Sequence, residues 1–566
     1  MADMTRTRRL SPRRNSTQAA DIPALVAEQL AHFGIPAGTP FGEKLTRVAT
    51  RLYEAHDDLD ELWQATLQTV DSLDRSDRVA YFNAKKFLSF QLAKLLDDLQ
   101  NPSRRSYQSL GYSQATVASK GPYAVFDNVT AIFAANPVIA RTATYIYACA
   151  EWIQDAFEGK ELLLEIYSRL LNPTSVALAN QIVALEAGPL ARDYFAWNFN
   201  SGMVAIDGTL AHLLGRDDFL ITNRNIYGGA FQLIHDWYGK PSNLAIQVET
   251  FDGLAAAGFL AAWERARARL AAGRRAYVYL ESPCNPHGDV LDVPAICREA
   301  HRLGLRVVLD GTVATPFLSR PLQRDDPIER PDFVIHSYTK DLSGTGGVLG
   351  GVVIGRNEDM FLPKGEPGWD ATMFWNVYYV KGAFLTPDAA YEILQGMRTL
   401  DVRMLDKCIN TRILMKFLAA HPQIRVHGAT GPTSLFLGLP APLFTADMPT
   451  VPLRAFERFF DSLAPTFDHM ISLGQSNTIV SCPAFTTHSE LDTAAQAEAG
   501  ISPTTIRYAV GEEDPKDLIA HFIASAKLMI DPELPGFSGR FMSPPEIVAL
   551  VRECYLDTHR RYIEQA

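Results

Sequence analysis

The sequence predicts an α/β fold, in which a mostly parallel sheet covered by helices is followed by a smaller α+β domain and preceded by an additional helical region. Three patterns support this prediction. Short apolar segments alternate with helical ones between residues 175 and 355, the pattern becomes mixed after about residue 400, and helical spacing dominates before residue 100. The 566 residues suffice for two or three hydrophobic cores, because one core stops growing near about 250 to 300 residues.

Residues 1–20 are predicted to form a disordered basic arm. No apolar core comes after the arginines of this segment, so it lacks the form of a secretory signal. An organelle transit peptide is the alternative, although the amphipathic pattern is poor. The arginines are Arg6, Arg8, Arg9, Arg13 and Arg14.

Residues 21–135 are predicted to form a helical N-terminal extension. Apolar residues such as Leu25, Leu30 and Phe33 recur at three- and four-residue spacing, and a polar loop over 101–121 separates these helices from the rest of the chain. Packing or oligomerisation is the default role of such an addition, with regulation as the alternative.

Seven short apolar segments form the predicted sheet. Helices are expected between them, including 202–214 and 294–303. Strands joined by crossover helices lie parallel, and ligands bind at their carboxyl ends. The predicted strands are 194–200, 218–222, 244–249, 277–281, 306–310, 333–336 and 351–354.

Charge and cysteine content exclude several classes of protein. The 53 basic and 64 acidic residues give a net charge of −11, so the chain lacks the basic field that nucleic acid or an anionic membrane requires. No apolar run of about 18 residues is present to span a membrane. The six cysteines form no CxxC pair, which argues against a metal site and for reduced thiols in a cytoplasmic protein.

Lys340 and Asp310 stand at the ends of two predicted strands. Lys340 closes the segment His336-Ser337-Tyr338-Thr339-Lys340, and Asp310 ends an apolar run thirty positions earlier. A lysine amine can hold the aldehyde of pyridoxal 5'-phosphate (PLP) as a Schiff base, while a carboxylate keeps the pyridine nitrogen of PLP protonated. A lysine beside hydroxyls is not specific by itself, so the wider context decides.

The stretch from Val307 to Gly355 resembles the PLP-dependent Cys/Met metabolism family, which includes cystathionine γ-synthase, cystathionine lyases and methionine γ-lyase. The likeness covers roughly residues 136 to 530. The other matching segments, in order, are Tyr167-Ser168-Arg169, Asn200-Ser201-Gly202-Met203, Tyr227-Gly228-Gly229, Glu281-Ser282-Pro283-Cys284-Asn285-Pro286, Gly396-Met397-Arg398-Thr399-Leu400 and Ile506-Arg507-Tyr508-Ala509-Val510-Gly511.

The resemblance implies the fold type I of PLP-dependent transferases, similar to aspartate aminotransferase. Residues 136–400 would then form the large PLP-binding domain, with an initial segment that clasps a neighbouring subunit. Residues 401–566 would form the small C-terminal domain and a tail that looks additional after residue 532. The resemblance also implies a homodimer or homotetramer with active sites shared between subunits.

The same resemblance assigns the residues that bind the cofactor phosphate. Ser201, Gly202 and Met203 lie between a strand and a helix, where free backbone N–H groups and the helix dipole favour an anion. Ser337 and Thr339 resemble the hydroxyl donors of the family. Tyr167 and Arg169 match a pair that reaches the phosphate from the neighbouring subunit; arginine suits this role because its planar fork bonds two phosphate oxygens.

Five further residues correspond to positions around the cofactor ring and the substrate. Tyr227 corresponds to the tyrosine that stacks on the ring and exchanges a proton, and Asn285 to the asparagine near its phenolic oxygen. Arg507 resembles the arginine that pairs with the substrate carboxylate. Thr478 replaces the family's serine hydroxyl beside that arginine, and Asn477 replaces a glutamate, which argues against cystathionine formation.

These assignments predict γ-elimination or γ-replacement on a homoserine-, methionine- or cystathionine-like amino acid. After the substrate amine displaces Lys340, the freed lysine moves protons among the α-carbon, the β-carbon and the cofactor. The alternatives are a β-lyase, a specialised lyase that removes a non-sulfur γ substituent such as halide, and a non-catalytic scaffold of the same fold.

Overall fold

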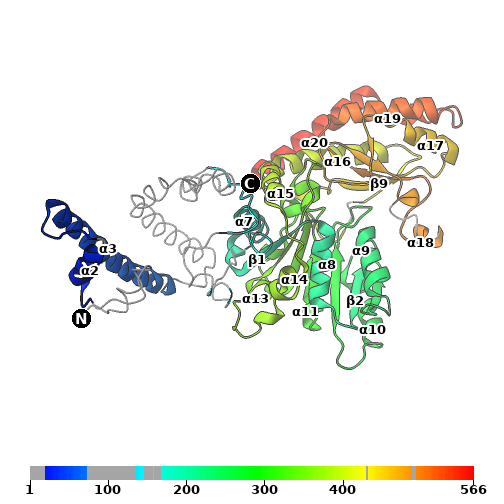
Figure 1. Ribbon diagram of the computed structural model, residues 1–566. Helices are drawn as coiled ribbons and strands as arrows, with labels where there is room; N and C mark the ends of the chain where they lie inside the picture. The colour runs from blue at the N-terminus through cyan, green and yellow to red at the C-terminus, as the bar shows by residue number, and fades with distance from the viewer. Residues whose placement is uncertain are drawn as a thin grey trace. The chain divides into compact units, whose positions relative to one another are not determined.

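The computed structural model divides the chain into two compact units, Met1–Thr130 and Ala131–Ala566 (Figure 1). The structure describes residues 19–32, 34–72, 135–145, 154, 157, 167–428, 431–486 and 493–565. The predicted basic arm, apart from its last two residues, and the polar loop at 101–121 lie outside the described residues.

The first unit contains two described helices, α2 (Ile22–His32) and α3 (Pro40–Asp71), in the region where helical spacing predicts them. Each helix begins at a capping side chain. The Asp21 carboxylate accepts a hydrogen bond from the Ala24 backbone N–H at 2.8 Å, and the Thr39 hydroxyl accepts one from Gly42 at 3.0 Å. Leu25 of α2 is fully buried, so the apolar face of this helix supplies packing.

The second unit contains a seven-stranded sheet in the order β1-β7-β6-β5-β4-β2-β3. Strand β7 pairs antiparallel with β1 and β6, and the other pairings are parallel, as the sequence predicts. The strands are β1 (Tyr194–Phe199), β2 (Phe219–Asn223), β3 (Gln247–Phe251), β4 (Ala276–Glu281), β5 (Arg306–Asp310), β6 (Phe333–Ser337) and β7 (Gly351–Arg356).

Helices contact this sheet from one end to the other (Figure 1). α7 lies against β1, α8 against β6 and β7, α10 against β2 and β3, and α11 against β5. The helices of this part are α7 (Pro173–Ala187), α8 (Gly202–Leu213), α9 (Gly228–Gln232), α10 (Ala256–Arg267), α11 (Val293–Arg302), α12 (Thr315–Leu318), α13 (Asn357–Met360), α14 (Tyr379–Lys381) and α15 (Pro387–Met397).

Strand β3 begins three residues later than predicted. Leu244 and Ala245 continue the apolar run, but they form a turn: the Leu244 carbonyl accepts a hydrogen bond from Asp217 at 2.9 Å, and Ala245 has a φ of 53°. A positive φ removes a residue from extended backbone, so the ladder with β2 starts only at Gln247. The apolar pattern alone does not reveal this turn.

The C-terminal part folds into a five-stranded sheet in the order β10-β11-β12-β9-β8 with helices against it (Figure 1). The tail after residue 532 forms α20, which contacts α16 through an ion pair between Asp557 and Arg412 at 2.9 Å. The elements are α16 (Leu400–Ala419), β8 (Arg425–His427), β9 (Leu443–Asp447), α17 (Leu453–Asp461), β10 (Asp468–His469), β11 (Ile479–Ser481), α18 (Thr493–Glu498), β12 (Thr505–Ala509), α19 (Pro515–Met529) and α20 (Pro544–Gln565).

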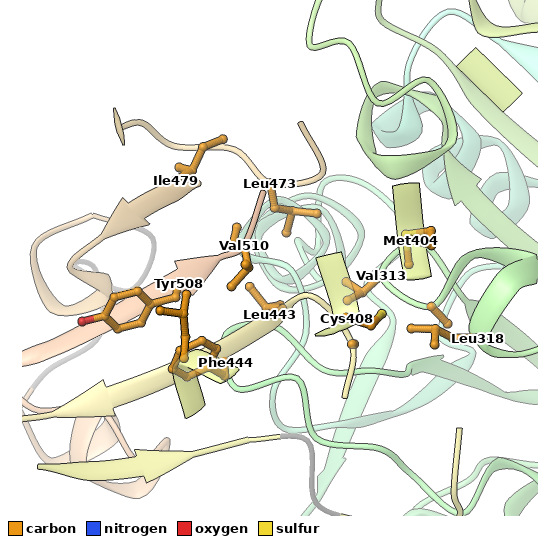
Figure 2. Packing of buried hydrophobic residues seen from close by; sticks show 14 of the residues in the cluster. Val313, Leu318, Met404, Cys408, Leu443, Phe444, Leu473, Ile479, Tyr508 and Val510 are labelled. Carbon is orange, nitrogen blue, oxygen red and sulfur yellow. The ribbon is translucent and has the colours of Figure 1, made fainter. Parts of the chain in front are cut away.

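One apolar cluster joins the two sheets through α16, as Figure 2 shows. Met404 of α16 and Val313, which comes after β5, belong to the same cluster as Leu443 of the smaller sheet. Burial of such side chains stabilises by roughly 1.5 to 3 kcal/mol each. The cluster therefore holds the end of β5 and the smaller sheet in one packed arrangement.

Within the described residues, no helix combines the length and the apolar character that a membrane span requires.

Candidate active site

A cavity of about 210 Å³ lies at the carboxyl ends of β4, β5 and β6, where the sequence places the ligand site. Seven residues outside the predicted set also line it: Ile206, Glu281, Thr312, Val313, Ile335, Leu349 and Leu473. The predicted residues that line this cavity are Ser201, Gly202, Met203, Tyr227, Asn285, Asp310, Ser337, Thr339 and Lys340.

Lys340 lies in a helical turn, Tyr338–Leu342, that directly follows β6. Its Nζ donates a hydrogen bond to the hydroxyl of Ser472 at 3.1 Å. Burial lowers the pKa of the Lys340 amine below its ordinary value, and the positive charge of Arg507 lowers this pKa further. The amine is therefore more easily deprotonated than an exposed lysine, as a nucleophile and base requires.

Asp310 is the last residue of β5 and is 6% exposed. Its carboxylate accepts hydrogen bonds from the Thr312 backbone N–H at 3.0 Å and from the Tyr279 hydroxyl at 3.4 Å. Burial raises the pKa of Asp310 and, together with the charge of Asp310, that of the adjacent Glu281. Among the described residues no cation forms an ion pair with either carboxylate, so a cationic ligand atom here would offset an uncompensated desolvation cost.

The beginning of α8 offers free donors to an anion. The hydroxyl of Ser201 caps the helix by accepting from the Val204 N–H at 3.2 Å. The N–H groups of Gly202 and Met203 have no hydrogen-bond partner among the residues that the structure describes. A Cβ at Gly202 would lie 2.8 Å from the Ser337 hydroxyl, so only glycine lets these two segments approach.

Glu281 holds two cavity residues by their backbones. Its carboxylate accepts from the N–H of Tyr227 at 2.6 Å and from the N–H of Asn285 at 3.0 Å. A Cβ at Gly229 would lie 2.6 Å from the Tyr227 ring, so glycine permits this ring to lie against the backbone. Glu281 was missed as a site residue, although it opens a matching sequence segment.

Arg507 of β12 does not line the cavity itself but contacts Asn285, a residue that does. Its Nη2 donates to the Ser472 carbonyl at 2.8 Å, and its Nη1 to the Asn285 side chain at 3.5 Å. The side chain is almost completely buried, and burial lowers its pKa to about 10. Its Nε has no partner in the described part of the chain, which leaves a buried donor for an anionic ligand.

Asn477 and Thr478 do not line the cavity. The Thr478 hydroxyl donates to Glu513 at 2.7 Å and accepts from the Gly511 N–H at 2.9 Å, while the Asn477 amide donates to Asp468. Ser472, which sequence reasoning missed, contacts both Lys340 and Arg507: its hydroxyl accepts from the Lys340 amine, and its backbone carbonyl accepts from Arg507.

Tyr167 and Arg169 also lie outside this cavity. The Arg169 guanidinium donates to the Tyr379 carbonyl at 2.6 Å and lies 5.8 Å from the centre of the Tyr167 ring. Tyr167 is 43% exposed. Neither residue completes the cavity of its own chain.

Comparison with known proteins identifies the family. The model of the family described as Cys/Met metabolism PLP-dependent enzyme matches residues 126–431 and 444–526. The chain belongs to this family. It is therefore a PLP-dependent enzyme of Cys/Met metabolism, and residues 1–125 lie outside the match.

Members from bacteria share just under a third of their residues with this enzyme. It is 30% identical over 395 residues to an L-methionine gamma-lyase of Pseudomonas putida, covering 68% of this chain and 90% of that protein. It is 30% identical over 424 residues to an O-succinylhomoserine sulfhydrylase of Mycobacterium tuberculosis, covering 72% of this chain and 95% of that protein.

A solved structure of the family has the same fold. The putative O-acetylhomoserine (thiol)-lyase of Campylobacter jejuni superimposes with a TM-score of 0.59 at 26% identity, covering 69% of this chain and 95% of that one. It was solved with N'-pyridoxyl-lysine-5'-monophosphate, a PLP group joined to lysine.

The cavity of this family member fits PLP. The cofactor carries an aldehyde, a phosphate and a basic ring nitrogen. The cavity offers the Lys340 amine and the N–H groups of Gly202 and Met203, which have no partner among the described residues. It also offers the buried carboxylate of Asp310, which has no cationic partner among the described residues. Each group of the cofactor therefore has a complementary group in this chain.

Proposed function

We propose that this enzyme catalyses γ-elimination or γ-replacement on a homoserine-, methionine- or cystathionine-like amino acid. The relatives named L-methionine gamma-lyase and O-succinylhomoserine sulfhydrylase support this class of substrate. The observation that carries the proposal is the position of the Lys340 amine, which hydrogen-bonds Ser472 while the same serine's carbonyl accepts from Arg507. The Lys340 amine and the Asp310 carboxylate thus line one small cavity, and Arg507 contacts Asn285 of its lining.

Lys340 is the residue that moves protons. When bound, PLP withdraws electrons from the bonds at the substrate α-carbon. The Lys340 Nζ would accept the proton from the α-carbon and release it to the cofactor, and the amine, neutral again, would then accept one from the β-carbon, after which the γ substituent can leave. The lowered pKa of this amine favours the neutral form that can accept a proton. Ser472 holds the amine by a hydrogen bond.

The remaining cavity residues hold the cofactor in this proposal. The phosphate is bound by hydroxyl and backbone donors that converge at the start of α8. These donors belong to Ser201, Gly202, Met203, Ser337 and Thr339. Three residues bind the cofactor ring. Asp310 pairs with the ring nitrogen, and Asn285 contacts the phenolic oxygen. Tyr227 stacks on the ring and also exchanges protons with the amine or leaving group.

Arg507 binds the substrate α-carboxylate, with Ser472 beside it. Its buried Nε lacks a partner among the described residues, and an arginine fork pairs with a carboxylate through two hydrogen bonds. Leu349 and Leu473 give the cavity apolar walls that suit a short thioether or ester side chain. Asn477 and Thr478, the two predicted substrate contacts, would act only if their present hydrogen bonds were exchanged.

Replacement by a second amino acid has less support than elimination or transfer to a simple thiol. An incoming amino acid needs an acidic group for its ammonium. In the described residues that line the cavity, the carboxylates are Asp310 and Glu281, and both are occupied by hydrogen bonds from the chain. Asn477 stands where the family resemblance places a glutamate.

The enzyme works as a homodimer, or as a tetramer built from dimers, in this proposal. Tyr167 and Arg169 would bind the phosphate in the neighbouring subunit, since they do not line their own cavity. Two exposed apolar side chains support a second copy: Leu349 of the cavity is 65% exposed, and Val380, next to the Tyr379 that Arg169 contacts, is 66% exposed.

Product analysis tests the reaction. The protein is incubated with γ-substituted amino acids and with a β-substituted one such as O-acetylserine, each with and without thiols. The γ-substituted compounds are methionine, cystathionine, O-acetylhomoserine, O-succinylhomoserine and a γ-halogenated amino acid. We expect ammonia and a 2-oxo acid from γ-substituted substrates, and a thioether product when a thiol is present. Lys340→Ala protein is the control for uncatalysed loss. Reaction of β-substituted amino acids alone would refute the assignment to the γ-carbon.

A further inference from the structure

A buried ion pair lies directly behind Lys340. Asp341, the next residue, is 1% exposed, and Lys407 of α16 is fully buried. The Lys407 Nζ donates a hydrogen bond to one carboxylate oxygen of Asp341. The other Asp341 oxygen is buried without a partner in the described part of the chain.

Lys407 also holds the loop that carries Ser472. Its Nζ donates a second hydrogen bond to the Gln475 carbonyl at 2.9 Å. The loop of residues 472–475 contacts Lys340 at two places: the Ser472 hydroxyl accepts from the Lys340 amine at 3.1 Å, and a Cβ on Gly474 would lie 2.8 Å from the Lys340 Cα. One ammonium therefore joins the side chain of Asp341, next to Lys340, to the backbone of the loop that carries Ser472.

A second cation of α16 holds the same turn. Arg403, one helical turn before Lys407, donates to the Asp341 carbonyl at 2.9 Å and to the Gly396 carbonyl at 2.9 Å. The side chain and the backbone of Asp341 are thus both bound to α16. Because α16 belongs to the apolar cluster that joins the two sheets, it provides a rigid support for the Lys340 turn.

Stability alone does not account for such a pair. Removing two charges from water costs several kcal/mol for each ion, and well-packed apolar residues in place of a buried pair are often neutral or stabilising. A buried pair beside a reactive lysine can instead fix the position of the lysine, because a shift of a catalytic group by about 1 Å lowers the reaction rate.

We propose that Asp341 and Lys407 are positioning residues, which orient the Lys340 amine against Ser472 and, through the 472–475 loop, against Arg507. This inference rests on the proposed function, in which Lys340 binds the cofactor and moves protons. Neither positioning residue touches the substrate; both act through the turn that carries Lys340.

The test compares a single variant with a charge-neutral double variant. In Lys407→Met the Asp341 carboxylate stays buried and unpaired, so we expect a lower Tm. In Asp341→Asn/Lys407→Met both charges are gone, and we expect Tm to recover. We expect kcat of this double variant to remain reduced about tenfold or more, since Arg403 then holds the turn without the contact between Asp341 and Lys407.

A spectroscopic readout separates positioning from stability. The visible absorbance of the cofactor-bound enzyme is titrated with pH. The negative charge of Asp341 raises the pKa of the free Lys340 amine and, by the same attraction, favours a protonated imine at this nitrogen, so its removal should move the midpoint of the visible titration to lower pH. The matched control is Arg412→Gln/Asp557→Asn, which removes another ion pair of α16, one that contacts α20 instead. Both kcat and the midpoint should be unchanged in this control.

A double variant with the wild-type kcat and the wild-type midpoint would overturn the inference. The visible absorbance of the unmodified enzyme distinguishes this failure from failure of the proposed function. If the unmodified enzyme binds PLP at Lys340 and the double variant behaves like it, only the positioning role is lost. If the unmodified enzyme does not bind PLP at Lys340, the proposed function fails first.

Discussion

Lys340 is a base whose surroundings disfavour its charged form. Burial removes water from the ammonium, and Arg507 repels it, while Asp341 and Asp310 oppose this effect in part. The pKa is lowered as a result. Neighbouring charges therefore tune the same amine that the sequence singles out by its position after a strand.

The Lys340 amine of the cofactor-free protein should react with an amine-directed reagent at lower pH than a free lysine side chain. The neutral amine is the reactive form, and a lowered pKa makes it available below 10.5, the ordinary value. Competitive labelling across a pH series, with mass analysis of the Lys340 peptide, measures this midpoint. The same peptide in urea-unfolded protein is the reference, and equal midpoints in the two states would contradict the prediction.

Replacement of Arg507 by leucine should raise KM by about 10- to 100-fold, because a charge-assisted hydrogen bond to the carboxylate is lost. In the unmodified enzyme KM should rise as the pH passes about 10, where the guanidinium loses its proton. Steady-state kinetics over a pH series measures both effects. Arg265→Leu, at an ion pair with Glu249 that does not line the cavity, serves as the control. A KM that is unaffected by Arg507→Leu would remove this arginine from the substrate site.

At the scale of elements, the start of α8 creates the anion site. The helix begins where β1 ends, and Ser201 caps it, so the first N–H groups point away from the helix without partners in the described residues. Gly202 allows the turn after β6 to approach these donors. Two elements far apart in sequence thus meet at a glycine.

Gly202→Ala should weaken PLP binding about tenfold without unfolding the protein, because the added Cβ would displace Ser337 from the phosphate donors. Fluorescence titration of the cofactor-free protein with PLP measures the dissociation constant, and circular dichroism checks the fold. Gly539→Ala, where a Cβ would meet no atom within 4 Å, is the control. Equal PLP affinity in the two variants would argue against a phosphate at this helix.

Residues at strand ends were predictable, and residues fixed by distant contacts were not. Asp310 and Lys340 were found because each ends a strand or its connecting turn, where a parallel sheet binds ligands. Ser472 was not found, since it reaches Lys340 across 132 positions of the chain and no local pattern marks it. Thr478 was chosen by its motif, yet Glu513 and Gly511 occupy its hydroxyl.

At the scale of the whole molecule, α16 ties the large sheet to the smaller one, and the tail helix α20 lies on α16. The alternation of apolar and helical segments was enough to predict the parallel sheet, the smaller mixed domain and the order of the seven strands along the chain. The residues before 126, outside the family match, have no function that the sequence or the fold indicates. Their role stays a prediction: packing or oligomerisation, with regulation as the alternative.

Mixed dimers should recover activity if the active sites are shared. Lys340→Ala and Arg169→Leu proteins should each be inactive alone. With random pairing, half of the dimers are mixed and one of their two sites is intact, so activity should reach about a quarter of the wild-type value. Co-expression with two affinity tags and an ammonia assay measures this. A co-expressed sample that stays inactive would indicate that Arg169 serves its own subunit.

Borohydride reduction of the PLP-bound protein, with subsequent peptide mass mapping, tests the central assignment most directly. Reduction turns a PLP group joined to a lysine amine into a stable pyridoxyl-lysine. We expect the added mass on the peptide that contains Lys340, and its loss in Lys340→Ala. Added mass on a different lysine, or none on any peptide, would contradict the account.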